Sequence, residues 1–173
     1  SNTPLLFLHN ITGYMVGTEA EQGGMIKHGS KMIQAVSNSK VPRISVLIGG
    51  SFGAGNYGMS GRAYDPRFVF AWPNTKIAVM GGEQAARVLS MITEEKYRKM
   101  GVTVDPSVLE KLTGQVKEKI DKESTALYAT ARLWDDGLID PRDTRKVVAF
   151  ALATCWESER RTLHPITFGA ARM

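Results

Sequence analysis

The residues best suited to chemistry lie in a run of small side chains at 49–61, which reads GGSFGAGNYGMSG. The run follows an apolar segment at 43–48 that is predicted to form a strand, and it opens a short helix predicted over about 53–61. Small residues let a ligand approach the backbone closely, and the first N–H groups of a helix lack partners within it and lie at its positive end. The run is therefore predicted to bind an anion or a carbonyl oxygen that gains charge during reaction. A tight packing turn is the alternative.

The same run also matches the dinucleotide-binding pattern G-x-G-x-x-G at Gly53, Gly55 and Gly58. In that fingerprint a full crossover helix follows the glycines, and an acidic residue comes about 20 residues later. Here Gly61 and an Asp-Pro pair at 65–66 end the helix early, and a Lys-Ile pair occupies 76–77. An NAD-binding reductase domain is therefore only a distant alternative.

Two further glycine-containing segments follow predicted strands. The loop at 10–18 leaves the first strand and enters the first helix, and the ends of strands in open α/β sheets are where ligands bind. An ordinary connecting loop explains it equally well. Gly81 and Gly82 open a helix with Glu83 near its first turn. That position suits the helix dipole, and a closely packed helix start is the alternative.

The usual catalytic side chains are not arranged for catalysis. The three histidines are scattered without metal-ligand spacing, and no G-x-S-x-G nucleophile motif occurs. Cys155 lies on an apolar helix face and is predicted to be core. The acidic cluster is explained by turns and helix caps, so no metal site is predicted. The histidines are His9, His28 and His164, and the acidic cluster consists of Asp135, Asp136, Asp140 and Asp143. An enzyme built this way would use backbone donors, with proton transfer supplied by a cofactor or substrate.

The elements that must position these segments alternate between strands and helices. Apolar runs predict strands at 5–8 (buried), 43–48, 67–71 and 76–80. Helices are predicted at 19–37, 82–92, 93–100 and, long or broken, 106–131, with a last one through 147–154 capped by Asp140 or Asp143. The alternation predicts an α/β fold with largely parallel strands. The tail at 160–173 is predicted to be an irregular arm or a frayed end.

Composition limits the class of protein. The 173 residues fit one domain, and 22 basic against 17 acidic residues are scattered without a basic stripe, so no nucleic-acid partner is predicted. The apolar runs are too short to span a bilayer, so no membrane association is predicted. One cysteine excludes an internal disulfide and indicates a reducing compartment. The Ser-Asn start resembles a cloning remnant, and the strand directly after it suggests a piece of a longer chain.

Four stretches of this sequence resemble a known family. They are FLHNITGYMVGTEAEQGGMIKHGSKM at 7–32, RISVLIGGSFGAGNYGMSGRAYDPRFVFAWPNTKIAVMGGEQAA at 43–86, ATARLWDDGLIDPRDTR at 129–145 and FGAARM at 168–173. All four resemble the carboxyltransferase (β) subunits of biotin-dependent acyl-CoA carboxylases, in the branch of methylcrotonyl-CoA and geranyl-CoA carboxylases. The resemblance covers nearly the whole chain and is weaker at 101–123 and 162–167.

The resemblance implies a ClpP/crotonase-like fold, a spiral of ββα units. It also implies that residues 1–173 are the C-terminal carboxyltransferase domain of a longer two-domain subunit. In the family this half forms the biotin side of the active site, and the N-terminal half supplies most of the acyl-CoA site. The isolated chain is therefore expected to be inactive.

The resemblance further implies a reaction: a carboxyl group passes from carboxybiotin to an acyl-CoA of the 3-methylcrotonyl type, a step of leucine degradation. The freed biotin nitrogen takes the proton, and backbone N–H groups stabilise the biotin and enolate oxyanions. In this sequence the oxyanion turn falls on Gly53, Ala54 and Gly55. The segment expected to line the biotin channel consists of Thr12, Gly13, Tyr14, Met15, Val16 and Gly17. The residues expected to shape the pocket are Phe52, Asn56 and Tyr57.

The implied partners are a biotin-carrying α (biotin carboxylase) subunit, further copies of the β subunit and acyl-CoA. The compartment is a bacterial cytoplasm or a mitochondrial matrix. The acceptor could instead be geranyl-CoA or a propionyl or acetyl type of acyl-CoA. A non-catalytic module that only builds an oligomer is the alternative from another class.

Overall fold

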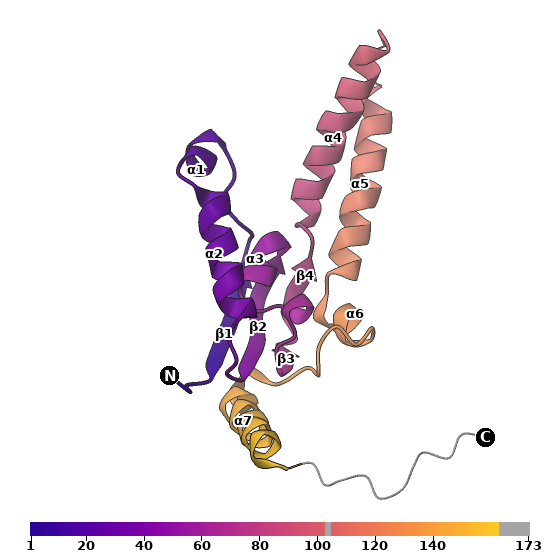
Figure 1. Ribbon diagram of the computed structural model, residues 1–173. Helices are drawn as coiled ribbons and strands as arrows, with labels where there is room; N and C mark the ends of the chain where they lie inside the picture. Colours follow the sequence, from indigo (N-terminus) through magenta and orange to yellow (C-terminus); the bar gives the residue numbers. More distant parts are fainter. Residues whose placement is uncertain (103–104, 163–173) are drawn as a thin grey trace, which may run out of the picture.

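A parallel β-sheet forms the centre of the protein in a computed structural model, which describes residues 1–102 and 105–162 (Figure 1). Within these residues the sheet has four strands, in the order β1-β2-β3, and β4 pairs with the far end of β2. The strands are β1 (Leu5–Ile11), β2 (Arg43–Phe52), β3 (Phe68–Ala71) and β4 (Lys76–Ala78). The predicted α/β class with parallel pairing is confirmed.

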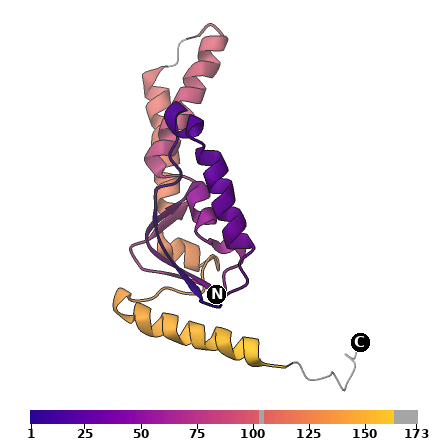
Figure 2. The same cartoon turned by 60° about the vertical axis from the view of Figure 1, so that its left-hand side comes forward.

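Strand β2 is central because its first half is buried on both faces, as expected for a covered parallel strand. Ile44 and Val46 are buried in the main core cluster with Phe70 of β3. Helix α7 (Thr144–Arg160) completes this cluster with Val148 and Ala151, and it crosses beneath the sheet in Figures 1 and 2. The buried strand predicted at 43–48 is thus present, and it continues to Phe52 because its second half pairs with β4.

Strand β1 differs from the buried strand predicted at 5–8. It runs to Ile11, and Leu5, Leu6 and Leu8 keep 39–48% of their surface exposed. The physical reason is its position at the edge of the described sheet, where it pairs with β2 alone. His9 is its one fully buried side chain.

The helices differ from the prediction at their breaks. The helix predicted at 19–37 is two helices, because Gly24 adopts φ +90° between them. The two helices predicted at 82–92 and 93–100 are one. The stretch predicted as long or broken at 106–131 breaks at Ser124, after which Thr125 caps a new helix. The bounds are α1 (Thr18–Gln22), α2 (Met25–Ser37), α4 (Gly82–Lys99), α5 (Pro106–Glu123) and α6 (Ala126–Thr130).

Helices α4 and α5 form a hairpin that projects from the sheet, and α1 and α2 project beside it (Figure 2). No helix in the described part of the chain is long and apolar enough to cross a lipid bilayer. The arm predicted at 160–173 lies largely outside the described residues. Cys155 is buried on α7, as predicted, and burial raises the pKa of its thiol.

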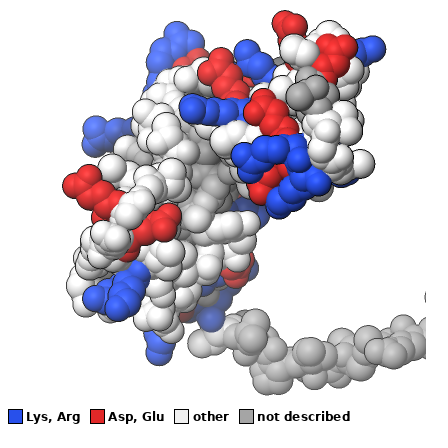
Figure 3. Space-filling view, turned by 90° about the horizontal axis from the view of Figure 1, so that it is seen from above, with Lys and Arg blue, Asp and Glu red and all other residues white. Residues whose placement is uncertain are grey.

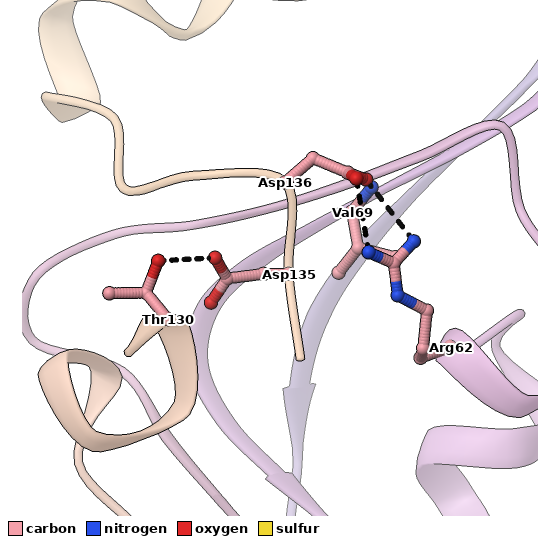
Figure 4. Close-up of polar contacts among 5 residues, drawn as sticks. All are labelled: Arg62, Val69, Thr130, Asp135 and Asp136. Carbon is pink, nitrogen blue, oxygen red and sulfur yellow. Dashed lines mark hydrogen bonds and ion pairs between the residues drawn. The ribbon is translucent and has the colours of Figure 1, made fainter. Parts of the chain in front are cut away.

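The acidic cluster serves turns and caps, as predicted (Figure 4). Asp136 accepts hydrogen bonds from the Val69 N–H at 2.7 Å and from Arg62, whose guanidinium it also pairs with at 3.0 Å. Asp135 accepts from the Thr130 hydroxyl at 2.7 Å. These bonds tie the segment after α6 to β3. Asp140 caps the short 3₁₀ turn Pro141–Asp143 rather than α7 itself, which begins at Thr144 without a side-chain cap.

Arg43 is a buried cation at the start of β2, and it is bound by backbone carbonyls rather than by a carboxylate. Its guanidinium donates to the carbonyl oxygens of Val36 (2.6 Å), Ser39 (2.8 Å), Tyr64 (2.8 Å) and Asp65 (3.3 Å). Hydrogen bonds from a charged donor are about twice as strong as neutral ones. Arg43 therefore joins the end of α2 to the segment that follows the run at 49–61.

His9 forms a second buried polar centre, between β1, β2 and the segment after it. Its Nδ1 lies 2.9 Å from the Ser51 hydroxyl and its Nε2 lies 2.7 Å from the Met59 carbonyl oxygen. Burial lowers the pKa of the His9 imidazole below its ordinary value of 6.5, although the bond to Met59 opposes this shift. The neutral ring is therefore the form that the folded chain holds at pH 7.

Replacing Arg43 by Met is expected to lower the free energy of unfolding by about 3 kcal/mol, because buried carbonyls lose a charged donor. Denaturant unfolding measures this. Arg87→Met, on the exposed surface of α4, is the control and is expected to change stability by less than about 0.5 kcal/mol. Equal stability of the two variants would contradict the assignment.

Stability is expected to fall as the pH drops below 6.5, because the unfolded chain then protonates His9 while the folded chain does not. Above pH 6.5 both states hold the neutral ring, so His9 contributes no slope there. Between pH 6.5 and the lowered pKa of His9, the free energy of unfolding changes by at most about 1.4 kcal/mol per pH unit. Melting curves of the protein and of His9→Gln are measured from pH 8 down to about pH 5, the range in which His titrates. Because Gln does not titrate, the difference between the two proteins isolates the contribution of His9. Parallel curves for the two proteins would refute it.

Candidate active site

The turn between β2 and α3 (Gly53–Gly58) is where the predicted oxyanion residues lie. Strand β2 ends at Phe52 and the helix begins at the next residue. Gly53 makes this possible with φ +59°, and a Cβ there would sit 3.1 Å from the Val79 carbonyl oxygen. The N–H groups of Gly53, Ala54 and Gly55 precede the first hydrogen bond that α3 can make within itself. Of these three residues, Gly53 and Ala54 line a pocket and Gly55 is buried.

Helix α3 is shorter than predicted, because it ends at Gly58 rather than near Gly61. Six residues give a weak dipole, since the macrodipole sums over aligned peptide units. The chemistry of this turn therefore rests on individual N–H groups. The glycines of the G-x-G-x-x-G pattern all lie inside α3, and no long crossover helix follows them as a dinucleotide site requires.

The structure brings the predicted channel segment 12–17 against this turn at one point. A Cβ on Gly55 would lie 2.5 Å from Ile11 Cγ2 and 3.4 Å from the Gly13 Cα. Two glycines facing each other allow the backbones to meet here. Gly13 and the exposed Thr12 thus lie next to the start of α3.

The remainder of the channel segment divides in two. Tyr14 turns inward between Gly29 of α2 and Gly58 of α3, and its buried hydroxyl has no hydrogen-bond partner among the described residues. Met15 and Val16 point outward with 72% and 86% of their surface exposed. Together with Gly17, they line an open pocket of about 620 Å³ beside α1 and α2. The segment therefore does not form one continuous wall.

A pocket of about 320 Å³ lies directly beside the oxyanion turn. One wall comes from the strand–helix junction and includes the predicted Gly53, Ala54, Asn56 and Tyr57. The other wall is apolar and was not predicted from the sequence. The full lining is Ser51, Gly53, Ala54, Asn56, Tyr57, Ile77, Ala78, Val79 and Trp134.

The three residues predicted to shape the pocket lie in different environments. Asn56 donates from Nδ2 to the Ser51 hydroxyl at 2.7 Å, so its side chain is held by the protein. Tyr57 is 45% exposed and meets Tyr64 edge-on at 5.9 Å between ring centroids. Phe52 is half-buried over Gly50, where a Cβ would come within 2.9 Å of its ring, and it does not line the pocket.

Trp134 is the pocket residue that sequence reasoning missed most clearly. It lies far along the chain, and two isolated bridges, Lys76 to Thr125 and Ala71 to Leu138, bring its segment against β4 and β3. Its ring meets Tyr128 edge-on at 5.9 Å. Neither spacing nor periodicity links Trp134 to the turn at Gly53, so the sequence by itself held no signal for this contact.

The arrangement suits stabilisation of a charged oxygen more than acid–base catalysis. None of the described residues that line this pocket is a His, Cys, Lys or carboxylate. What the chain offers there is a set of backbone donors beside an apolar wall. Such donors stabilise an oxygen that gains charge, with the largest effect where water is excluded.

Comparison with known proteins gives concordant matches. The carboxyl transferase domain family matches residues 1–168. The probable biotin-dependent acyl-coenzyme A carboxylase beta2 subunit of Mycobacterium tuberculosis is 57% identical over 153 residues, which are 88% of this chain and 29% of that protein. The biotin-dependent 3-methylcrotonyl-coenzyme A carboxylase beta1 subunit of the same organism is 49% identical over 170 residues, or 98% of this chain and 32% of that protein.

A solved structure agrees with these matches. The beta subunit of geranyl-CoA carboxylase from P. aeruginosa superposes with a TM-score of 0.88 at 58% identity, covering 99% of this chain and 32% of that one. The chain thus spans about a third of the length of the relatives that it matches. With its parallel sheet, its glycine-rich turn and these matches, the chain belongs to the carboxyl transferase domain family.

Proposed function

We propose that this chain is the C-terminal, biotin-side carboxyltransferase domain of an acyl-CoA carboxylase β subunit. The reaction is transfer of a biotin-borne carboxyl group to an acyl-CoA of the 3-methylcrotonyl type. One observation carries the proposal: Gly53 and Ala54 of the turn line a pocket, with Gly55 buried directly after them, in a chain 49% identical to a 3-methylcrotonyl-CoA carboxylase subunit. Backbone donors beside an apolar wall are what a reaction through oxyanions needs.

The pocket beside the turn fits the ureido ring of biotin. That ring is uncharged and carries one carbonyl oxygen, which matches the backbone donor of Ala54 beside the apolar wall of Ile77, Val79 and Trp134. Figure 3 supports this match, because charged side chains of both signs gather on the projecting helices and the surface between them is mostly uncharged. Bound biotin would supply the carboxyl group and a nitrogen able to take a proton.

The residues of this chain act by binding and orienting. The N–H groups of Ala54 and Gly55 stabilise negative charge on the ureido oxygen, and one such donor contributes about 3–4 kcal/mol to lowering a barrier. Gly53 sets the direction of these donors through its positive φ. Thr12 and Gly13 close the turn from the side of β1, and Met15, Val16 and Gly17 line a separate open pocket beside α1 and α2.

The remainder of the active site belongs to other parts of the assembly. The N-terminal half of a two-domain subunit supplies most of the acyl-CoA site and completes a crotonase-type spiral of ββα units. The partners are a biotin-carrying α subunit and further β subunits, in a bacterial cytoplasm or in a mitochondrial matrix. The exposed leucines of β1 support a protein contact at that edge, because an uncovered apolar edge strand favours association.

Geranyl-CoA is the second candidate acceptor. The observation that favours it is the TM-score of 0.88 and 58% identity to a geranyl-CoA carboxylase β subunit. Propionyl- or acetyl-type acceptors are the remaining option.

The complete β subunit, assembled with its biotinylated partner, is expected to fix labelled bicarbonate onto 3-methylcrotonyl-CoA in an ATP-dependent reaction. Geranyl-CoA, propionyl-CoA and acetyl-CoA are assayed in parallel, and the preferred acceptor defines the enzyme. Carboxylation of free biotin by the partner is the control for an intact first half-reaction. A complex that passes this control and carboxylates none of the four acceptors would refute the proposed function.

Ala54→Pro is expected to lower kcat of the assembled enzyme by about 10²–10³-fold, because proline removes one N–H donor. Proline is tolerated in the first turn of a helix, where that N–H has no partner inside the helix. Glu83→Pro, at the same position in the first turn of α4, is the matched control. The donor assignment fails if a correctly assembled Ala54→Pro enzyme keeps the kcat of this control.

A further inference from the structure

His9 lies close to the oxyanion turn but outside the pocket. Its side chain is fully buried on β1, and the pocket beside Gly53 and Ala54 does not include it. It therefore cannot touch a ligand in that pocket. Both of its ring nitrogens are nevertheless engaged, one with Ser51 and the other with Met59.

The acceptor at Met59 fixes the direction of every bond in this group. A carbonyl oxygen can only accept, so Nε2 of His9 carries the proton and donates to Met59. Nδ1 must then accept, and the hydroxyl of Ser51 donates to it. The Ser51 oxygen in turn accepts the N–H of the Asn56 side chain at 2.7 Å. The result is a directional chain from Asn56 through Ser51 and His9 to Met59.

This chain of hydrogen bonds holds α3 at both of its ends. Ser51 stands two residues before Gly53, Asn56 lies within the helix, and Met59 is its C-terminal cap residue. Of the four residues in this chain of bonds, His9 is the one outside this segment, on β1 and 42 residues before Ser51. Because α3 has only six residues, its own hydrogen bonds fix its orientation poorly. The direction of the first-turn N–H groups therefore depends on these side-chain bonds.

We propose that His9 is a positioning residue, which acts through Ser51, Asn56 and Met59 to hold the oxyanion donors of Ala54 and Gly55 in their productive direction. This inference rests on the proposed function for the role of those donors. Burial lowers the pKa of His9 and so favours the neutral ring that the chain of bonds requires. A buried network in which every member is satisfied rigidifies the elements it joins.

The test uses the complete β subunit assembled with its biotinylated partner, and it compares His9→Leu with His9→Gln. Leu fills the space without polar atoms, whereas Gln is neutral and carries both a donor and an acceptor. His9→Leu is expected to lower kcat for carboxyl transfer on the order of tenfold to a hundredfold, because misplacement of catalytic groups by about 1 Å has such effects. The KM for acyl-CoA is expected to stay within about threefold of its starting value. His9→Gln is expected to restore most of kcat.

Ser45 offers a matched control on the same strand. It is fully buried like Ser51, and its hydroxyl donates to the Ser60 carbonyl oxygen at 2.6 Å, outside the His9 network. Ser45→Ala loses one side-chain hydrogen bond and Ser51→Ala loses two, so both are expected to lower the melting temperature, Ser51→Ala by more. Only Ser51→Ala is expected to lower kcat. Because Ser51 also lines the pocket, the double variant with His9→Leu is measured too, and losses smaller than additive identify a shared network.

A readout without activity separates this inference from the proposed function. Amide hydrogen exchange at 56–59, where the N–H groups bond within α3 and at its end, is expected to accelerate in His9→Leu and to stay unchanged in Ser45→Ala. A wild-type complex that carboxylates no acyl-CoA overturns the proposed function, and the exchange measurement still decides whether His9 holds α3. The positioning role is overturned by an assembled His9→Leu enzyme with the kcat and exchange rates of the wild type. If His9→Leu fails to assemble, an unchanged kcat in Ser51→Ala overturns it.

Discussion

The close approach of three backbones around the start of α3 is the constraint on which the site depends. Strand β2 runs directly into α3 through Gly53, the loop after β1 touches α3 at Gly55, and the segment after β4 reaches Gly53 through the Val79 carbonyl. A Cβ at either glycine would meet an atom of another segment within 2.5–3.1 Å. Glycine is therefore required at the two positions on either side of Ala54, at Gly53 because of its positive φ and at Gly55 because a Cβ would collide with Ile11.

The polar interior keeps this arrangement in place. A glycine-rich turn has little side-chain packing of its own, so its position must be fixed by hydrogen bonds from neighbouring elements. Arg43 anchors the segments on either side of the turn through backbone carbonyls. His9, Ser51 and Asn56 connect the helix itself to β1. Buried polar groups destabilise a fold when left unpaired, and the bonds among His9, Ser51, Asn56 and Met59 pair them while joining α3 to β1.

The sequence predicted the elements that depend on local patterns. Apolar runs located all four strands, and the turn at Gly53 and the acidic turn at Asp135 were recognised from residue type. The breaks between helices were less accurate. The glycine pair at 23–24 divides a predicted helix because Gly24 takes a positive φ, whereas the boundary predicted at 92–93 does not exist, because helix α4 is stabilised along its length by packing on α5.

The sequence by itself determined the chemical character of the site: a strand followed by glycines, backbone donors, no acid–base pair, and a resemblance that the family match bears out. Only the tertiary structure decided which side chains complete the site. Trp134 and Val79 form its apolar wall, Tyr14 turns away into the interior, and His9 becomes a buried anchor. The physical reason for this division is that some features depend on residues near in sequence and others on residues far apart in it. Backbone conformation follows from neighbouring residues, whereas a pocket wall forms where segments distant in sequence pack together to bury apolar surface.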